Sequence, residues 1–189
     1  MTVDHNARRK SIAEVTAEVI AREGLEAATI RRISAELGGP TKIITYYFSD
    51  KQELLRFTWE HMAELYHEKV SHGSADIIET LLAMTTADEK SILRWRVYVA
   101  FWDRATRDPE FARIQRIHMD MTLKLLGNIV RKLDPAGTDV ERISLLLNAL
   151  VQGISLQSLV DPERWPPERI RAALTGQVAV LLPRAQLPS

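Results

Sequence analysis

The spacing of apolar residues along the chain predicts helices rather than strands. Ile12, Val15, Val19 and Ile20 recur at the interval of one helix face, in a helix that we expect over about 6–23. No segment shows sustained two-residue alternation, and no Asn-Gly or Asp-Gly pair marks a hairpin turn. The pattern as a whole therefore predicts an all-α protein with about nine helices and no sheet.

A glycine turn joins the next two helices. Thr29 is a suitable N-cap for the first of them, Gly38-Gly39 turns the chain, and Pro40 fits the first position of a second helix of about one and a half turns. The inward residues that we expect on these two helices are Ile30, Ile33, Leu37, Ile44, Tyr47 and Phe48. Two short amphipathic helices around a tight turn are typical of a helix-turn-helix, whose second helix lies in the major groove of DNA.

Caps and apolar stripes predict the remaining helices. Capping boxes are expected at 49–52, 86–89 and 138–141, and Asp108-Pro109-Glu110 has the composition of a further helix start. The helices expected after the helix-turn-helix cover about 50–71, 74–84, 86–106, 108–133, 140–160 and 165–182, with breaks at Gly73-Ser74 and 135–137. This organisation predicts a three-helix DNA-binding domain over 1–52 and a larger helical ligand-binding and dimerisation domain over 53–189, with the helix at about 50–71 as a shared connector.

The composition is that of a soluble globular protein. Apolar residues make up 46% of the 189 residues and charged residues 26%, a balance that excludes a disordered chain. Without cysteine there is no disulfide framework and no cysteine-ligated zinc. No apolar run approaches the roughly 20 residues that span a bilayer, and the polar N-terminus has no signal core. We therefore expect a cytoplasmic protein.

The formal net charge is zero, so any attraction to nucleic acid has to be local. Between residues 29 and 51 the cations are Arg31, Arg32, Lys42 and Lys51, and the acids are Glu36 and Asp50. Four cations against two acids leave an excess of two positive charges, to which Arg8-Arg9-Lys10 adds. One end of the molecule is expected to be basic.

Three motifs within about the first 55 residues resemble one family. They are Thr29-Ile30-x-x-Ile33 with Gly38, Tyr46-x-Phe48, and Lys51-x-x-Leu54-Leu55. This stretch resembles the N-terminal domain of the TetR family of transcriptional regulators. The rest is more loosely similar to the choline-responsive BetI-type branch, through the run WRVYVAFW (95–102) and the order of the last two helices.

The resemblance implies a ligand-responsive DNA-binding regulator, with no enzymatic activity and no cofactor. Such a regulator is expected to be a repressor that a small molecule releases from a palindromic operator. The alternative is an all-helical small-molecule binding protein without operator binding, which would show no salt-dependent affinity for DNA. An enzyme is disfavoured because no nucleophile–base pair or phosphate-binding glycine loop is present.

The outer side of the second short helix is expected to meet base edges. Lys42 can reach guanine acceptors, and Thr41 or Thr45 can contact a thymine methyl group. The resemblance places Thr29, Tyr47 and Lys51 where the family often contacts phosphate, and Arg8 or Arg9 can add contacts. The DNA-binding residues that we expect are Thr29, Thr41, Lys42, Thr45, Tyr46, Tyr47 and Lys51. The competing interpretation is that Tyr46, Tyr47 and Phe48 only form the core of a small domain.

Three residues depart from the family pattern. Gly39 stands where a valine normally packs, Pro40 where a serine normally caps, and Lys42 where a glycine is common. A phosphate contact is therefore not expected from Pro40. Lys42 is the residue expected to give an unusual sequence preference.

An aromatic run is the second candidate site. Trp95, Tyr98 and Trp102 share one helix face with Phe101 beside it, and aromatic faces attract quaternary ammonium groups. The effector pocket that we expect, for an apolar or cationic ligand, contains Trp95, Tyr98, Phe101, Trp102, His118, Asn148 and Gln152, with Met119 and Met121 as further candidates. The competing interpretation is an ordinary hydrophobic core.

The last two helices carry more apolar surface than one chain can cover. A two-fold dimer that forms a four-helix bundle would cover it, and would also match a palindromic operator. The interface residues that we expect are Leu147, Leu150, Ile154, Leu174 and Val178. Metal binding is not expected, because the histidines form neither an H-x-x-x-H pair nor an H-E-x-x-H motif.

Overall fold

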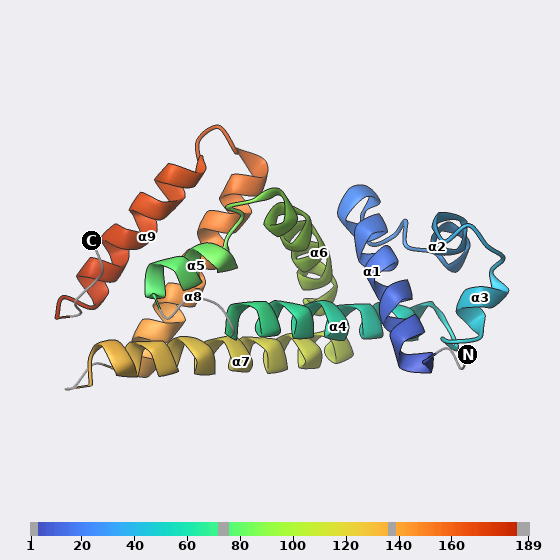
Figure 1. Ribbon diagram of the computed structural model, residues 1–189, viewed down its shortest axis with the longest axis horizontal. Coiled ribbons are helices and arrows are strands. Elements are labelled where there is room, and N and C mark those ends of the chain that lie inside the picture. Colours follow the sequence, from blue (N-terminus) through green and yellow to red (C-terminus); the bar gives the residue numbers. More distant parts are fainter. Residues whose placement is uncertain (1–3, 72–75, 136–138, 185–189) are drawn as a thin grey trace. The chain divides into compact units, whose positions relative to one another are not determined.

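Helices alone build the part of the chain that the computed structural model describes, residues 4–71, 76–135 and 139–184 (Figure 1). They are α1 (His5–Glu23), α2 (Ile30–Glu36), α3 (Lys42–Thr45), α4 (Lys51–Ser71), α5 (Ile77–Met84), α6 (Glu89–Ala105), α7 (Pro109–Leu133), α8 (Val140–Val160) and α9 (Pro167–Leu181). No strand occurs within these ranges. The prediction of an all-α protein with about nine helices is confirmed.

The chain divides into two compact units. The first comprises Met1–Tyr66 and Arg96–Gln115, and the second His67–Trp95 and Arg116–Ser189. The division falls inside α4, α6 and α7, so each of these helices belongs partly to both units. The structure thus groups the chain differently from a cut at residue 52, because the first half of α4 and parts of α6 and α7 share a core with the helix-turn-helix.

One continuous apolar core holds the first unit together. Its buried members include Ile12, Ile20, Ile33, Ile44, Phe48, Leu54, Trp59, Val97, Phe101, Phe111 and Ile114. α3 has only four residues, and a helix this short is stable only through tertiary packing. Ile44 and Phe48 supply that packing, since both side chains are almost completely buried. The ring of Phe48 also meets Phe57 of α4 edge-on, with centroids 5.6 Å apart.

Aspartates cap three helices for which the sequence pattern indicated Ser or Thr. Asp50 Oδ1 accepts the N–H of Glu53 at 2.8 Å, and Asp88 Oδ1 accepts that of Ser91 at 2.7 Å. Asp139 caps α8 in the same way. A carboxylate also interacts favourably with the positive end of the helix dipole. The predicted boxes at 49–52 and 86–89 are therefore wrong in register, and Thr138 lies outside the described residues.

Two other predicted boundaries change. Pro40 precedes α3, which begins two residues later at Lys42. α5 begins at Ile77 with Asp76 as its N-cap, whereas residues 73–74 and 136–137, where breaks were predicted, lie outside the described ranges. The start of α7 agrees with the pattern, because Asp108 Oδ1 accepts the N–H of Glu110 at 3.0 Å.

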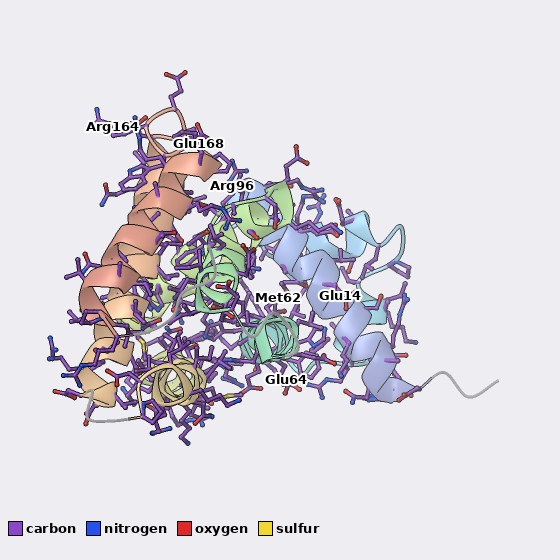
Figure 2. All side chains as sticks on the ribbon, turned by 60° about the vertical axis from the view of Figure 1, so that its left-hand side comes forward. Glu14, Met62, Glu64, Arg96, Arg164 and Glu168 are labelled. Carbon is purple, nitrogen blue, oxygen red and sulfur yellow. The ribbon has the colours of Figure 1, made fainter. Side chains whose placement is uncertain are left out.

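In the second unit α5 packs against both α8 and α9, which run side by side (Figure 1). Arg164 lies in the turn between these last two helices, and Glu168 lies at the start of α9 (Figure 2). The side chains that α8 and α9 bury against the rest of the chain include Leu147, Val151, Ile154, Leu174 and Val178. The unit is thus a packed helical body with its own apolar core.

α8 contradicts the expectation that no segment is long enough to span a membrane. It has 21 residues, its most apolar 18-residue window has a mean hydropathy of 1.6, and 44% of that window is buried within the protein. Length and composition alone would therefore permit a membrane span. However, α8 also buries Ser144, Asn148 and Ser155, and it packs against α5 and α9. These contacts indicate the core helix of a helical domain.

Candidate functional site

Two glycines, Gly38 and Gly39, form the turn between α2 and α3. Gly38 has a φ of +68°, in the left-handed region that favours glycine. At Gly39, an added Cβ would collide with the end of the Ile43 side chain, which occupies the space beside the turn. A side chain at residue 39 would therefore require the end of the Ile43 side chain to move aside.

One face of α3 is exposed while the other is buried. Thr41, Lys42, Thr45 and Tyr46 are exposed, and the Tyr46 side chain retains 72% of its accessible surface. The interpretation of Tyr46 as a core residue is therefore wrong, although it holds for the buried Phe48. Tyr47 is half-buried. The exposed face offers hydroxyl groups, one ammonium group and an aromatic ring.

A cluster of three rings lies beside α3. The rings of Tyr46 and Tyr47 meet at an interplanar angle of 83° with centroids 4.9 Å apart. His5, the first residue of α1, lies 4.8 Å from the Tyr47 centroid and 6.2 Å from that of Tyr46. The sequence pattern missed His5, because the contact joins a helix end to residues far along the chain and follows no periodicity.

A groove of about 430 Å³ lies between α1 and α3. It is lined by Arg8, Pro40, Lys42, Ile43, Tyr46 and Tyr47. No carboxylate belongs to this set. The groove thus combines two cationic side chains with apolar and aromatic walls.

The cations of the N-terminal region separate into paired and unpaired sets. Within residues 4–66, ion pairs engage Arg9, Arg22, Arg32, Lys51 and Arg56. Over the same residues, the structure gives no ion pair to Arg8, Lys10, Arg31 or Lys42. The excess of positive charge predicted from the sequence therefore resides in particular side chains, two of which line the groove.

Arg9 has a structural role. Its guanidinium lies 4.6 Å from the Phe48 ring centroid and 4.5 Å from that of Phe57, and Nη2 is 2.7 Å from Glu53 Oε1. A hydrogen bond from the Ser49 backbone is the largest cause that lowers the pKa of Glu53, and Arg9 contributes. Arg9 is thus committed to the core of the first unit and is not available for DNA in the way suggested by the sequence.

Arg32 links α1 to α2 through carboxylates. It lies 2.6 Å from Glu23 and 2.7 Å from Glu36, and Arg22 lies 2.5 Å from Glu36. Hydrogen bonds from Arg32 lower the pKa of Glu23, and those from Arg22 and then Arg32 lower the pKa of Glu36. A second link between α1 and α4 joins Glu14 (Figure 2) to His61, at 3.3 Å. These contacts fix α1 without neutralising the groove.

Two of the residues predicted to contact phosphate already have intramolecular roles. Thr29 Oγ1 accepts the N–H of Arg32 at 3.1 Å as the N-cap of α2, which leaves its hydroxyl hydrogen for another acceptor. Lys51 Nζ lies 3.5 Å from the Glu26 carbonyl oxygen and 3.9 Å from its carboxylate. Their phosphate contacts stay predictions.

The aromatic run of α6 divides between the two units. In the first unit, Phe101 is stacked between Trp59 and Phe111, with centroids 4.8 and 5.8 Å away. Phe101 is completely buried, so its assignment to a pocket wall is corrected to a core position. Tyr98 and Trp102 are half-buried neighbours, and the Tyr98 hydroxyl accepts a hydrogen bond from Gln115 at 2.9 Å.

The other predicted pocket residues lie in the second unit. Trp95 is buried and donates its indole N–H to the Met84 carbonyl at 2.9 Å. The amides of Asn148 and Gln152 both approach Met119 Sδ, at 3.0 and 3.8 Å. His118 stacks on His67 at a centroid distance of 5.9 Å. Met119 therefore brings two of the predicted pocket residues, Asn148 and Gln152, into one cluster.

Four of the five residues predicted for a dimer interface are core residues of one chain. Leu147, Ile154, Leu174 and Val178 have 3% exposure or less, and Leu150 is half-buried. The four buried side chains are therefore not contacts between protomers, because the chain's own fold covers them. The large apolar side chains that these helices expose are Leu145, Leu146, Leu156, Val160 and Val180.

The structure offers no metal site among its described residues, where no three His, Asp or Glu side chains are grouped to hold an ion. The exposed face of α3 offers hydroxyl, aromatic and cationic side chains, and the cluster around Met119 offers amides. Such groups bind ligands and nucleic acid by hydrogen bonds, stacking and charge.

Two family models together match most of the chain. Residues 12–56 match the model of bacterial regulatory proteins of the tetR family, and residues 75–183 match that of the C-terminal domain of BetI-type transcriptional repressors. The HTH-type transcriptional regulator PksA of Bacillus subtilis strain 168 is 32% identical over 194 residues, which cover 93% of this chain and 90% of PksA.

Solved structures show the same fold. A transcriptional regulator from Rhodococcus sp. Rha1 superposes with a TM-score of 0.86 at 24% identity, over 96% of this chain and 99% of that one. A regulator from Saccharomonospora viridis, solved in complex with choline, superposes with a TM-score of 0.80 at 22% identity, over 92% and 95% of the two chains.

Proposed function

This chain belongs to the TetR family of bacterial transcriptional regulators, and we propose that it represses transcription in the cytoplasm as a homodimer, by inserting α3 into a palindromic operator. The observation that carries this proposal is the exposed face of α3. Thr41, Lys42, Thr45 and Tyr46 leave that face open, although α3 is anchored by buried Ile44 and Phe48. A binding protein without an operator has no use for such a face, so the regulator is favoured over that alternative.

The exposed apolar surface of α8 and α9 supports a dimer. On α8 it runs through Leu145, Leu146, Leu156 and Val160, and Gly153 lies between them with open space beside its Cα. On α9, Val180 is exposed and Gly176 is equally open. Small residues let the backbones of facing helices approach closely, and a two-fold axis would pair this surface with its copy. Each half-site of a palindrome would then receive one α3, at a spacing of about 34–36 Å or a multiple of it.

The proposed effector is a small cationic or apolar molecule. Support comes from the match to the BetI-type repressor domain and from the choline complex of the Saccharomonospora viridis protein. Within the second unit, the amides that converge on Met119 can hydrogen-bond a polar group of such a ligand. An effector lowers operator affinity only by its differential affinity for the free and DNA-bound conformations.

The test of DNA binding uses the intergenic DNA beside the gene. Purified protein is expected to protect a palindrome in footprinting, with an affinity that falls steeply as salt rises from about 50 to 200 mM. Lys42→Glu reverses a charge on α3 and is expected to abolish protection, whether the ammonium meets a base or a phosphate. Arg113→Glu, on an exposed position of α7, is the matched control and should bind like wild type. Equal binding by both variants would reject α3 as the DNA-binding element.

Release is tested by titrating the footprinted complex. Choline and its neutral carbon isostere have the same shape and differ in charge. A site that recognises the positive charge of its effector therefore responds to choline alone. Release by the isostere but not by choline would indicate an apolar site. A ligand that binds the protein without shifting operator affinity is not the effector.

A further inference from the structure

Two cations of the N-terminal region share the groove between α1 and α3. Arg8 comes from α1 and Lys42 from α3, and both line the same space of about 430 Å³. Neither has an ion pair among the described residues, whereas neighbouring Arg9 is held by Glu53. No carboxylate lines the space that these two cations share, so an anion bound there would be attracted by both.

The location of the groove favours a phosphate over a base as that anion. A recognition helix reads bases with side chains that project beyond it into the major groove, whereas the helices that support it pass along the DNA backbone. Lys42 lines the groove on the side of α3 that faces Arg8 of α1, as do Pro40 and Ile43. Guanidinium and ammonium groups are the usual protein ligands of phosphate.

An aromatic cluster gives the groove a defined edge. Tyr46 and Tyr47 line it, and the His5 ring packs on Tyr47 at 4.8 Å. Tyr46 remains largely exposed, so its contacts with Tyr47 and His5 are what limit the freedom of its ring. Rings packed in this way are stabilised beyond their burial and hold their hydroxyl groups in place.

We propose that this groove binds one backbone phosphate of DNA between Arg8 and Lys42, and that His5 is a positioning residue for the two tyrosines at its edge. This inference rests on the proposed function, because it assumes that the protein binds DNA. It assigns Lys42 to affinity, in place of the base preference expected from the sequence. Base reading then belongs to Thr41 and Thr45, the exposed side chains at α3 that do not line the groove.

A double-mutant cycle tests whether the two cations share one phosphate. Arg8→Ala, Lys42→Ala and the double variant are titrated with the footprinted operator and with a random duplex of equal length, over a range of salt. Each single variant is expected to lose about tenfold or more in affinity on both duplexes. The double variant should lose less than the product of the two, and its log–log salt slope should fall by about two units from wild type, one for each half-site of the dimer complex.

Chemical neutralisation of the DNA identifies the phosphate itself. In a series of operators, one phosphate at a time is replaced by an uncharged methylphosphonate. One replacement in each half-site is expected to weaken wild type and to leave the double variant unchanged. This outcome requires that the lost contact be the one made by Arg8 and Lys42.

Three results overturn the proposal. Lys42→Ala could change the base preferred in a selection from random duplexes without changing the salt slope, which would make it a base reader. The slope of the double variant could fall by about four units, which would mean two separate phosphates in each half-site. The third such result is that no single methylphosphonate weakens wild type while leaving the double variant unchanged. A wild-type protein that binds no DNA would overturn the proposed function as well, so the two failures are distinguishable.

Two substitutions test the role of His5: one removes the aromatic ring at this position and the other keeps one. His5→Ala is expected to weaken operator binding about 2- to 10-fold and to lower the thermal midpoint by no more than about 4 °C, and His5→Phe is expected to restore binding. Asp4→Ala is the control for fraying of α1, since Asp4 is the N-cap and accepts the N–H of Asn6 at 3.0 Å. A loss as large in Asp4→Ala as in His5→Ala, or no rescue by His5→Phe, would reject positioning by the ring.

Discussion

Arg8 and Arg9 are adjacent in the sequence and have opposite environments. Arg9 lies between two phenylalanine rings and reaches Glu53, so it joins α1 to α4. Arg8 lies on the groove and has no ion pair within the described residues. A cluster of basic letters in the sequence cannot distinguish these two situations, because the difference depends on a partner 44 positions away.

Replacing Arg9 by Ala should therefore destabilise the protein. The loss of two cation–π contacts and one partly exposed ion pair is expected to lower the free energy of unfolding by about 1–2 kcal/mol. Arg8→Ala should change it by less than about 0.5 kcal/mol, as is usual for a surface position. Denaturant titrations of the two variants measure both values. Equal destabilisation would contradict the division of roles between these arginines.

His118 makes stability depend on pH. Burial, and then the neighbouring imidazole of His67, lower the pKa of His118 to about 4. The unfolded chain, with a pKa of about 6.5, therefore binds a proton first as the pH falls. Its contribution to stability is complete above about pH 6.5 and is lost as the pH falls toward 4.

The expected loss from His118 is about 1–2 kcal/mol between about pH 7 and pH 5. His118→Gln removes the titrating group, so its unfolding free energy should vary less over this interval. Chemical denaturation of both proteins at the two pH values gives the comparison. Parallel pH dependence in wild type and variant would show that the folded-state pKa of His118 is not lowered.

At the scale of helices, the sequence located the elements well but misassigned several caps. The ends of α7 and α8 agree with the apolar pattern, because a long stripe constrains its own register. A capping box is shorter and can be read in two registers whenever an aspartate follows the Ser or Thr. At Ser49-Asp50 and Thr138-Asp139 the aspartate caps, since its carboxylate accepts backbone N–H groups and carries the charge that the dipole favours.

The corrected cap of α4 can be measured. Asp50→Ala is expected to lower the free energy of unfolding by about 1 kcal/mol, because Glu53 N–H then loses its acceptor. Gln52 belonged to the predicted box, but in the structure its side-chain oxygen accepts a long hydrogen bond of 3.5 Å from Arg104 and does not cap the helix. Gln52→Ala should therefore be nearly neutral in the same denaturant titration. The reverse order of effects would support the register read from the sequence.

The candidate sites were predictable only in part. The exposed face of α3 follows from helical periodicity, since Ile44 and Phe48 define the buried side. Phe101 was assigned to a pocket because four aromatic residues crowd one helix, but its neighbours Trp59 and Phe111 come from other helices and enclose it. A periodicity shows which face is apolar. It does not show whether a helix, a ligand or a second protomer covers that face.

At the scale of the whole molecule, the exposed apolar residues of α8 predict a dimer that particular substitutions disrupt. Gly153 has open space beside it, so Gly153→Leu should leave the fold of one chain intact and obstruct a closely packed partner helix. Leu156→Lys would place a charge in the same interface. Both variants are expected to sediment as monomers at micromolar concentration and to bind the operator weakly.

Leu93→Lys is the matched control for these variants. Leu93 is a similarly exposed leucine, but it lies on α6 outside the proposed interface. Its replacement should leave the dimer and operator binding unchanged. A monomeric wild-type protein, or Gly153→Leu that remains dimeric, would contradict an interface at this face of α8.

The exposed leucines of α8 also bear on how gene control responds to the amount of repressor. A protomer that covers this surface only by pairing binds its operator as a dimer, and the dimer population varies with the square of the free protomer concentration when pairing is incomplete. When the protomer concentration lies below the dissociation constant of the dimer, halving the number of protein copies per cell would then reduce operator occupancy about fourfold at low saturation. The apolar surface of a single helix would thus make repression sensitive to gene dosage.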